Sequence, residues 1–223
     1  MKNKLFSLLL ALFTVLFIIS VSIALPIYIR PFYYAHIETY SLEARTGESA
    51  ENIKAAYDEV LDYLTLPNRE FGTGVFEYSE EGKSHFVDCK FLFDLDTAVL
   101  IISAVAIMLL AVLASKKVFT VCRPLGAHLL LTCGGATLAL FLTLGLVASI
   151  DFDTTFVIFH KMFFPGKENW IFNPYTDEII RALPQAFFAN CALLIASSII
   201  ALSLFCVIFG IVELKKSKRK KVC

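Results

Sequence analysis

Histidine is the residue type in this chain best suited to proton transfer, because an unperturbed imidazole has a pKa of about 6.5 and can give and take protons at neutral pH. The chain has four, His36, His85, His128 and His160. His85 and His160 come from separate polar segments, and we expect them to converge as an acid/base pair. The spacing alone leaves open that each is a hydrogen-bonded histidine of a protein core.

The other two histidines are weaker candidates for chemistry. His128 lies at the edge of an apolar stretch, where we expect a packing or interfacial residue. His36 follows Tyr33 and Tyr34, and it either caps a helix or binds a lipid phosphate.

No familiar nucleophile or metal motif accompanies the histidines. The sequence has no GxSxG, HExxH or P-loop motif, and no CxxC pair among its six cysteines. A zinc site could be built from His85, His160 and a carboxylate such as Asp88 or Asp153, but the spacing typical of metal ligands is absent. We expect no metal and no cofactor, and an acid/base pair would need no protein nucleophile provided that the substrate brings its own.

A second reading is a non-catalytic module that binds lipid headgroups at the outer leaflet. Arg30, Tyr33, Tyr34 and Trp170 combine a cation and amphipathic rings of the kind that gather at membrane interfaces. In this reading the histidines are incidental hydrogen-bond donors.

The composition is that of an integral membrane protein. Hydrophobic residues make up 57% of the 223 residues, above the roughly 45–50% of soluble domains. Four apolar stretches without Lys, Arg, Asp or Glu approach the roughly 20 residues that span a bilayer: Leu5–Leu25, Thr97–Ala114, 125–150 and Ala186–Val212. The first could be a cleaved signal peptide, but it is longer than an ordinary signal-peptide core of about 7–15 residues. We expect four membrane helices.

The basic residues set the expected orientation. Eleven of the 20 Lys and Arg residues lie at the chain ends and in the connection 115–124, and the tail 213–223 holds most of them. Cytoplasmic segments carry this excess, so both termini are expected inside. Segments 26–96 and 151–185, with nineteen acids against nine bases, are then extracytoplasmic. The formal net charge of zero gives no reason to expect a nucleic-acid partner.

The first of these segments is long enough to hold a small domain. Ser49 is a good N-cap, Pro67 a good terminator, and the apolar residues between them recur at helical spacing: Ile53, Ala56, Tyr57, Val60, Leu61 and Leu64. This pattern predicts an amphipathic helix.

The remainder of that segment leads toward the second span. Phe71–Tyr78 alternates large and small side chains, which allows a short strand or hairpin, and Glu80–Gly82 reads as a turn. Ser84 then caps a predicted helix that presents three residues on one face: His85, Asp88 and Leu92.

The second segment predicts two helices. Asp153 can cap the first, whose one side is aromatic and suits a membrane interface: Phe156, Phe159, His160, Phe163 and Phe164. Asn173 and Pro174 suit the start of a second helix over Tyr175–Leu183. The predicted fold is therefore an integral membrane, mainly α-helical protein with four transmembrane helices and a small outer-face domain.

Several uncommon patches occur together in this sequence. They are Pro31–His36, Gly82–Asp88, Asp151–Asp153 with Phe159 and His160, Asn169 with Trp170, Asn173 and Pro174 with Asp177, and Leu183 with Pro184. On these patches and the order of the spans, the chain resembles the bacterial lipoprotein intramolecular transacylase family, known as Lit.

The resemblance implies an acyltransferase of the bacterial cell membrane. Its substrate would be a lipoprotein whose N-terminal cysteine carries a diacylglyceryl thioether, and the sn-2 acyl chain would move to the free α-amine, giving a lyso-form lipoprotein. The family's two histidines correspond to His85 and His160. Residues expected to be structural or to position the substrate and membrane lipids are Arg30, Tyr33, Tyr34, His36, Asp88, Asp153, Trp170 and Asp177.

Overall fold

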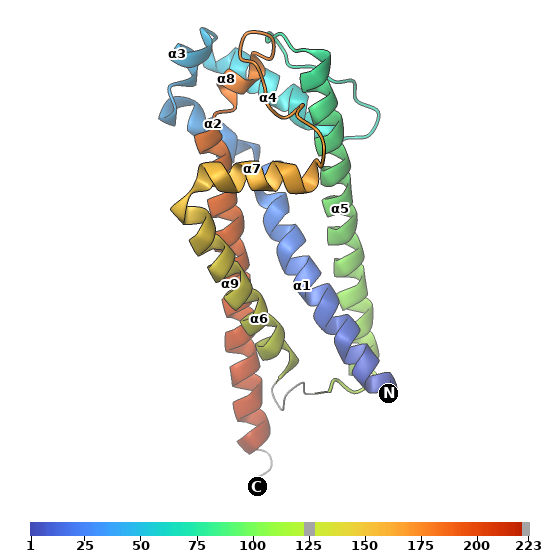
Figure 1. Cartoon of the computed structure of the whole chain (residues 1–223). Helices are drawn as coiled ribbons and strands as arrows, with labels where there is room; N and C mark the ends of the chain where they lie inside the picture. Colours follow the sequence, from blue (N-terminus) through green and yellow to red (C-terminus); the bar gives the residue numbers. More distant parts are fainter. Residues whose placement is uncertain (123–127, 220–223) are drawn as a thin grey trace. The chain divides into compact units, whose positions relative to one another are not determined.

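The computed structural model describes residues 1–122 and 128–219, and all regular secondary structure in that part of the chain is helical (Figure 1). The helices are α1 (Lys2–Tyr28), α2 (Arg30–Thr39), α3 (Leu42–Thr46), α4 (Ala50–Thr65), α5 (Glu80–Ser115), α6 (Leu129–Ile150), α7 (Phe152–Phe163), α8 (Ile179–Ala182) and α9 (Gln185–Arg219). The chain forms two compact units. We call them the membrane unit (Met1–Ile23, Thr97–Ser149 and Leu194–Cys223) and the polar unit (Ala24–Asp96 and Ile150–Leu193).

Among the described residues, four helices are long and apolar enough to cross a membrane, namely Lys2–Tyr28, Glu80–Ser115, Leu129–Ile150 and Gln185–Lys216. Three predicted stretches lie within them: Leu5–Leu25 in α1, Thr97–Ala114 in α5 and Ala186–Val212 in α9. The remaining predicted stretch, 125–150, continues into α6, but its first residues, 125–127, lie outside the described residues. The basic residues Arg123, Lys220 and Lys221 also lie outside them. The fold class predicted from the sequence is confirmed.

The polar unit is built around α4. Ser49 caps this helix as predicted, with its Oγ accepting a hydrogen bond from the Asn52 amide at 3.2 Å. All six residues of the predicted apolar face are buried: Ile53, Ala56, Tyr57, Val60, Leu61 and Leu64. Helix α4 packs against α2 and α3, and α3 packs on α8, so residues from both polar segments share one core.

Tyr33 of α2 ties the two polar segments together. Its ring is fully buried and stacks on Tyr57 with centroids 3.7 Å apart, and its hydroxyl donates to the Ala182 carbonyl oxygen at 2.8 Å. Burial raises the pKa of the Tyr33 hydroxyl, so the group stays a hydrogen-bond donor.

No strand or hairpin forms between residues 71 and 78, and that expectation was wrong. The small residues of the alternation serve close packing on α4: a side chain at Gly72 would collide with Glu59, and the Gly74 amide donates to Glu59 at 2.7 Å. Glu80 and its neighbours begin α5 rather than making a turn, and Ser84 lies inside that helix rather than at its cap.

The second polar segment also departs from prediction at its helix ends. Asp151, not Asp153, caps α7 by accepting from the Thr154 amide at 2.9 Å. The predicted helix over Tyr175–Leu183 is reduced to α8. Asn173 instead closes a turn, since its backbone oxygen accepts from the amides of residues 176 and 177.

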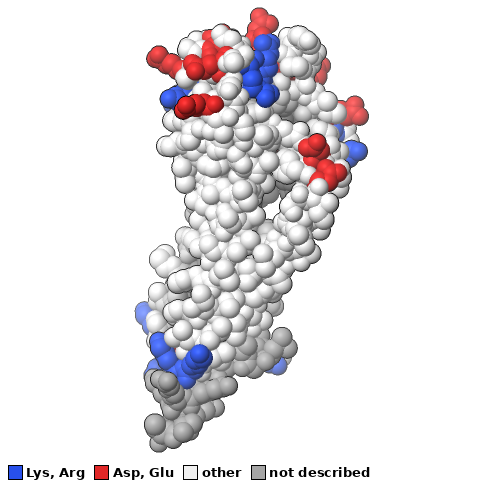
Figure 2. All heavy atoms as spheres, turned by 90° about the vertical axis from the view of Figure 1, so that its left-hand side faces the viewer, with Lys and Arg blue, Asp and Glu red and all other residues white. Residues whose placement is uncertain are grey.

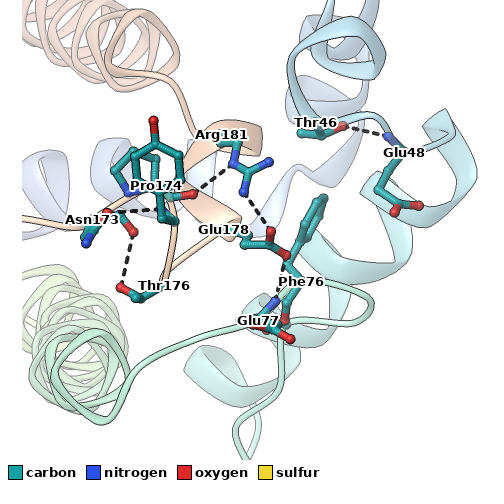
Figure 3. Close-up of polar contacts among 11 residues, drawn as sticks. Thr46, Glu48, Phe76, Glu77, Asn173, Pro174, Thr176, Glu178 and Arg181 are labelled. Atoms are coloured by element: carbon teal, nitrogen blue, oxygen red, sulfur yellow. Dashed lines mark hydrogen bonds and ion pairs between the residues drawn. The ribbon is translucent and has the colours of Figure 1, made fainter.

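Hydrogen bonds between two loops explain why α8 is shorter than the predicted helix (Figure 3). The Glu178 amide donates to the Glu77 carbonyl oxygen at 3.0 Å, and the Glu77 amide donates to the Glu178 carboxylate at 3.2 Å. Arg181 contacts both the Pro174 carbonyl oxygen and the Glu178 carboxylate. These contacts hold residues 173–178 in a turn.

Charge is distributed differently over the two units. On the face drawn in Figure 2, acidic side chains gather on the polar unit. By sequence, all acids except Glu213 belong to that unit, whereas the described part of the membrane unit has its basic residues at the ends of its long helices and in the connection after α5.

In the membrane unit, glycines allow α6 and α9 to approach closely. A Cβ at Gly134 would lie 2.8 Å from the Ser203 carbonyl oxygen, and one at Gly210 would lie 2.6 Å from the Leu131 amide nitrogen. Small residues at such crossings let membrane helices pack through their backbones.

This packing predicts different effects at two adjacent glycines. Gly134→Ala should lower the thermal unfolding midpoint of the detergent-purified protein, because overpacking at a tight contact costs about 1–3 kcal/mol. Gly135→Ala is the matched control, since a Cβ there meets nothing within 4 Å, and its midpoint should be unchanged or higher. Circular dichroism melting of both variants checks this. Equal shifts would contradict the proposed close packing.

Candidate functional site

The polar unit brings His85 and His160 together. Their ring centroids are 5.8 Å apart, and the residues are only 6% and 8% exposed. His85 comes from the first turns of α5 and His160 from the last turns of α7. The convergence expected from the sequence is present.

The start of α5 is fixed by a buried carboxylate. Asp177 accepts hydrogen bonds from the Ser79 amide at 2.9 Å and the Ser79 hydroxyl at 2.7 Å, while the Ser79 hydroxyl accepts from the Gly82 amide at 3.0 Å. A side chain at Gly82 would occupy the space of the Asp177 carboxylate. Asp177 therefore positions the helix that carries His85. It does so through Ser79, directly before the helix, and not by contact with the histidines.

The two ring nitrogens of His85 have different surroundings. Nε2 lies 3.4 Å from the Sγ of Cys89, one helical turn further on. Nδ1 is buried, and it has no hydrogen-bond partner in the part of the chain that the structure describes. A buried polar atom without a partner is rare and marks a place where a ligand can bind.

His160 is oriented by its own helix and by Trp170. Its Nδ1 lies 2.8 Å from the Phe156 carbonyl oxygen, which can only accept, so Nδ1 carries a proton. In the neutral ring Nε2 is then an unprotonated acceptor. The indole of Trp170 stacks on the imidazole with centroids 4.7 Å apart.

Aromatic rings surround both imidazoles. Phe156 lies 4.2 Å from His160 by ring centroids, whereas Phe164 and Phe172 lie 4.8 and 5.5 Å from His85. The site is therefore apolar apart from its histidines and one polar cluster.

Burial keeps both histidines neutral at physiological pH. It lowers the pKa of His85 to about 4, with the neighbouring His160 and Lys167 acting in the same direction and Asp88 opposing them. Burial also lowers the pKa of His160, against the effect of its hydrogen bond to Phe156. Neutral imidazoles can accept a proton or donate a hydrogen bond, but carry no charge of their own.

The polar cluster beside His85 consists of Ser84, Asp88, Lys167 and Asn169. Lys167 forms an ion pair with Asp88, and Asn169 Nδ2 donates to Ser84 Oγ at 2.9 Å and Asp88 Oδ2 at 3.0 Å. Burial raises the pKa of Asp88, but the hydrogen bonds from Lys167 and Asn169 outweigh it and hold that pKa below its usual range. The turn leading into this cluster needs glycine at 166, where φ is +73°.

The remaining predicted site residues lie in two other groups. Arg30 forms ion pairs with Asp58 and Asp62 on α4, and the Tyr34 hydroxyl donates to Asp58 at 2.7 Å. These contacts, like those of Tyr33, stabilise the core of the polar unit. The side chains that the sequence suggested for binding lipid headgroups are therefore hydrogen-bonded or ion-paired within the protein.

His36 and Asp153 also contact the start of α9. His36 Nε2 lies 2.9 Å from Asn190 Nδ2, and its Nδ1 lies 2.6 Å from the Phe32 carbonyl oxygen. Asp153 accepts from Gln185 at 2.7 Å. Of the predicted residues, only His85, His160, Asp88 and Trp170 therefore form one site.

Sequence reasoning missed several residues of that site, among them Cys89, Lys167 and Asn169. Cys89 lies one turn after His85, so helical spacing could have found it. Asn169 was part of a family-like patch without an assigned role, and nothing in the sequence connects Lys167 with Asp88. Within the described ranges, no group of three or more His, Cys, Asp or Glu side chains is arranged to hold a metal ion.

Solved structures share this fold. The membrane integral lipoprotein intramolecular transacylase Lit from Bacillus cereus superposes with a TM-score of 0.87 at 24% sequence identity, covering 98% of both chains. Two variants of that protein, one with a histidine-to-arginine and one with a histidine-to-alanine mutation, each give 0.79 at 24% identity. These cover 98% of this chain and 95% and 96% of theirs. No curated protein matches the chain in sequence.

A family model decides the classification. The model described as "Lipoprotein intramolecular transacylase Lit" matches residues 8–188, which include both histidines and the whole polar cluster. The resemblance seen in the sequence is thereby confirmed, and the reading as a non-catalytic binding module is replaced by an enzyme. The chain belongs to the lipoprotein intramolecular transacylase (Lit) family and is a multi-pass membrane acyltransferase.

Proposed function

We propose that this transacylase moves the sn-2 acyl chain of a diacylglyceryl-modified N-terminal cysteine to the α-amine of the same cysteine. His85 and His160 are the catalytic residues, and the product is an N-acylated lyso-form lipoprotein. The observation that carries this proposal is the pair of neutral, buried imidazoles 5.8 Å apart inside an aromatic enclosure. An intramolecular transfer supplies its nucleophile from the substrate, so the protein needs only to position it and move a proton.

His160 is the general base in this proposal. The hydrogen bond between Nδ1 and the Phe156 carbonyl oxygen leaves the lone pair of Nε2 free. As the neutral amine attacks the ester carbonyl carbon and the C–N bond forms, Nε2 takes a proton from the nitrogen. Protonated His160 then gives that proton to the glycerol oxygen as the C–O bond breaks, so no water is consumed.

His85 stabilises the oxyanion of the tetrahedral intermediate. Burial raises the pKa of the Cys89 thiol to about 12, so the thiol stays protonated and can donate to His85 Nε2. Nδ1 then carries the ring proton and is a donor without a partner in the described chain. A neutral donor fixed in an apolar site stabilises developing negative charge without having to reorganise.

The enclosure around the histidines favours transfer over hydrolysis. Phe156, Phe164, Phe172 and Trp170 surround the imidazoles with rings, and an apolar enclosure of this kind would keep water from the reacting ester. Holding amine and ester together can itself lower the barrier by roughly 7–11 kcal/mol for well-oriented groups. Most of the polar unit therefore serves to position a substrate that contains both reactants.

The proposed place of reaction is the extracytoplasmic leaflet of a bacterial cell membrane. Eleven Lys and Arg residues at the chain ends and in connection 115–124 put both termini in the cytoplasm by the positive-inside rule. The polar unit then faces outward, where mature lipoproteins and membrane lipids meet it.

Replacing either histidine tests the chemistry. His160→Ala should lower the transfer rate by about 10²–10⁴-fold, the usual contribution of a general base, and His85→Ala should also leave the substrate mostly unconverted. The substrate and the product are isomers of equal mass, so fragment ions in tandem mass spectrometry of the N-terminal lipopeptide distinguish the two acylation patterns. His36→Ala, in a histidine outside the site, is the control and should convert fully. Normal conversion by both site variants would exclude the acid/base pair.

The pH dependence of His85 gives an independent test. A histidine is neutral above its pKa, so a ring with a pKa of about 4 stays neutral at pH 5.5, where an ordinary histidine is mostly charged. In ¹⁵N-histidine-labelled enzyme, the His85 resonances should be constant from pH 8 to pH 5 and should move near pH 4. His85→Ala assigns them. Titration close to pH 6.5 would show that the ring is hydrated.

A further inference from the structure

Asn169 has a side chain whose orientation is fixed by its neighbours. Its amide group lies against Asp88 Oδ2 at 3.0 Å and Ser84 Oγ at 2.9 Å. Asp88 forms an ion pair with Lys167, and its lowered pKa keeps it a carboxylate, which can only accept hydrogen bonds. The nitrogen of the Asn169 amide must therefore face Asp88, and its oxygen is held away from Asp88.

That oxygen is an unused acceptor. Asn169 Oδ1 is buried and has no hydrogen-bond partner among residues 1–122 and 128–216. Leaving a carbonyl oxygen buried and unpaired costs stability, so each such atom calls for an explanation. The Nδ1 atom of His85, which is more than nine-tenths buried, is the other unpartnered atom in this site.

Asn169 is connected to the surroundings of both histidines. Its side chain bonds to Ser84 and Asp88, which flank His85 on α5, and the next residue, Trp170, stacks on His160. The segment that carries this amide therefore contacts the helix that bears His85 and the ring of His160.

The chemistry of the substrate identifies what the oxygen would bind. An acceptor needs a donor, and the reacting part of a diacylglyceryl-cysteine has few: the acyl chains, the esters and the thioether have no N–H or O–H group. The α-amine is its strong donor. A neutral primary amine has two N–H bonds and one lone pair, and His160 Nε2 engages only one of those bonds in the proposed mechanism.

We propose that Asn169 Oδ1 accepts the second N–H of the substrate α-amine and thereby aims the nitrogen lone pair at the ester carbonyl. Asn169 is thus a specificity-determining residue that selects a primary amine. This inference rests on the proposed transfer to the α-amine.

The test compares two unreactive lipopeptides on the full-length protein in detergent. Both have an ether in place of the sn-2 ester, and one has the α-amine replaced by hydrogen. The wild-type protein should bind the amine compound more tightly. Asn169→Ala should reduce that preference by about 10-fold or more, the size of one hydrogen bond to a charged or buried partner, and should bind the des-amino compound as the wild type does. An unchanged preference for the amine would overturn the proposal.

A merely structural role of Asn169 would have a different signature. If Asn169 only supports Asp88 and Lys167, its loss should weaken binding of both compounds equally, which would also overturn the proposal. The exchanged double variant Asn169→Asp with Asp88→Asn keeps an amide donor facing a carboxylate, and keeps an acceptor oxygen on residue 169. This double variant should still bind the amine compound more tightly than the des-amino compound. Equally tight binding of both compounds would count against the assignment.

The ester substrate separates this inference from the proposed function. If fragmentation of the lipopeptide in tandem mass spectrometry shows that the wild-type protein does not move an acyl chain to the α-amine, the proposed function fails. If it does move the chain and Asn169→Ala keeps the full amine preference, only the role of Asn169 fails.

Discussion

Removal of two neighbouring imidazoles from water is the constraint on which the rest of the polar unit depends. Desolvation keeps His85 and His160 uncharged at neutral pH. Two charged rings at this place would repel each other, and a charged base would already hold the proton that it must collect. The Phe156 carbonyl oxygen then places a proton on Nδ1 of His160, and the Cys89 thiol lies beside Nε2 of His85.

The supporting structure converts two distant segments into one rigid frame for these rings. Asp177 reaches from the second segment to the cap of α5, Tyr33 reaches from the first segment to the end of α8, and the Glu77 and Glu178 backbones bind one another. Each of these contacts replaces a hydrogen bond to water with one inside the protein. The site is consequently held by long-range polar contacts around an apolar core centred on α4.

The sequence predicted those features that depend on local pattern. The spans follow from uninterrupted apolar runs, and the six-residue buried face of α4 follows from helical spacing. It failed where tertiary contacts override local preference: Glu59 takes the space beside Gly72, and the Glu77 contact stops a helix over Tyr175–Leu183. Arg30 forms its ion pairs within the polar unit. Lys167 and Asn169 belong to the site because they contact Asp88, and no local sequence pattern indicates these contacts.

Trp170 is the only tryptophan in the chain, and its indole lies on the imidazole of the proposed base. A protonated imidazole accepts an electron from an excited indole far more readily than a neutral one does, so the emission intensity of this residue carries information about the charge of His160. The native protein thus contains its own optical sensor of the reacting group. Steady-state and stopped-flow fluorescence can follow occupancy of the site without any added label.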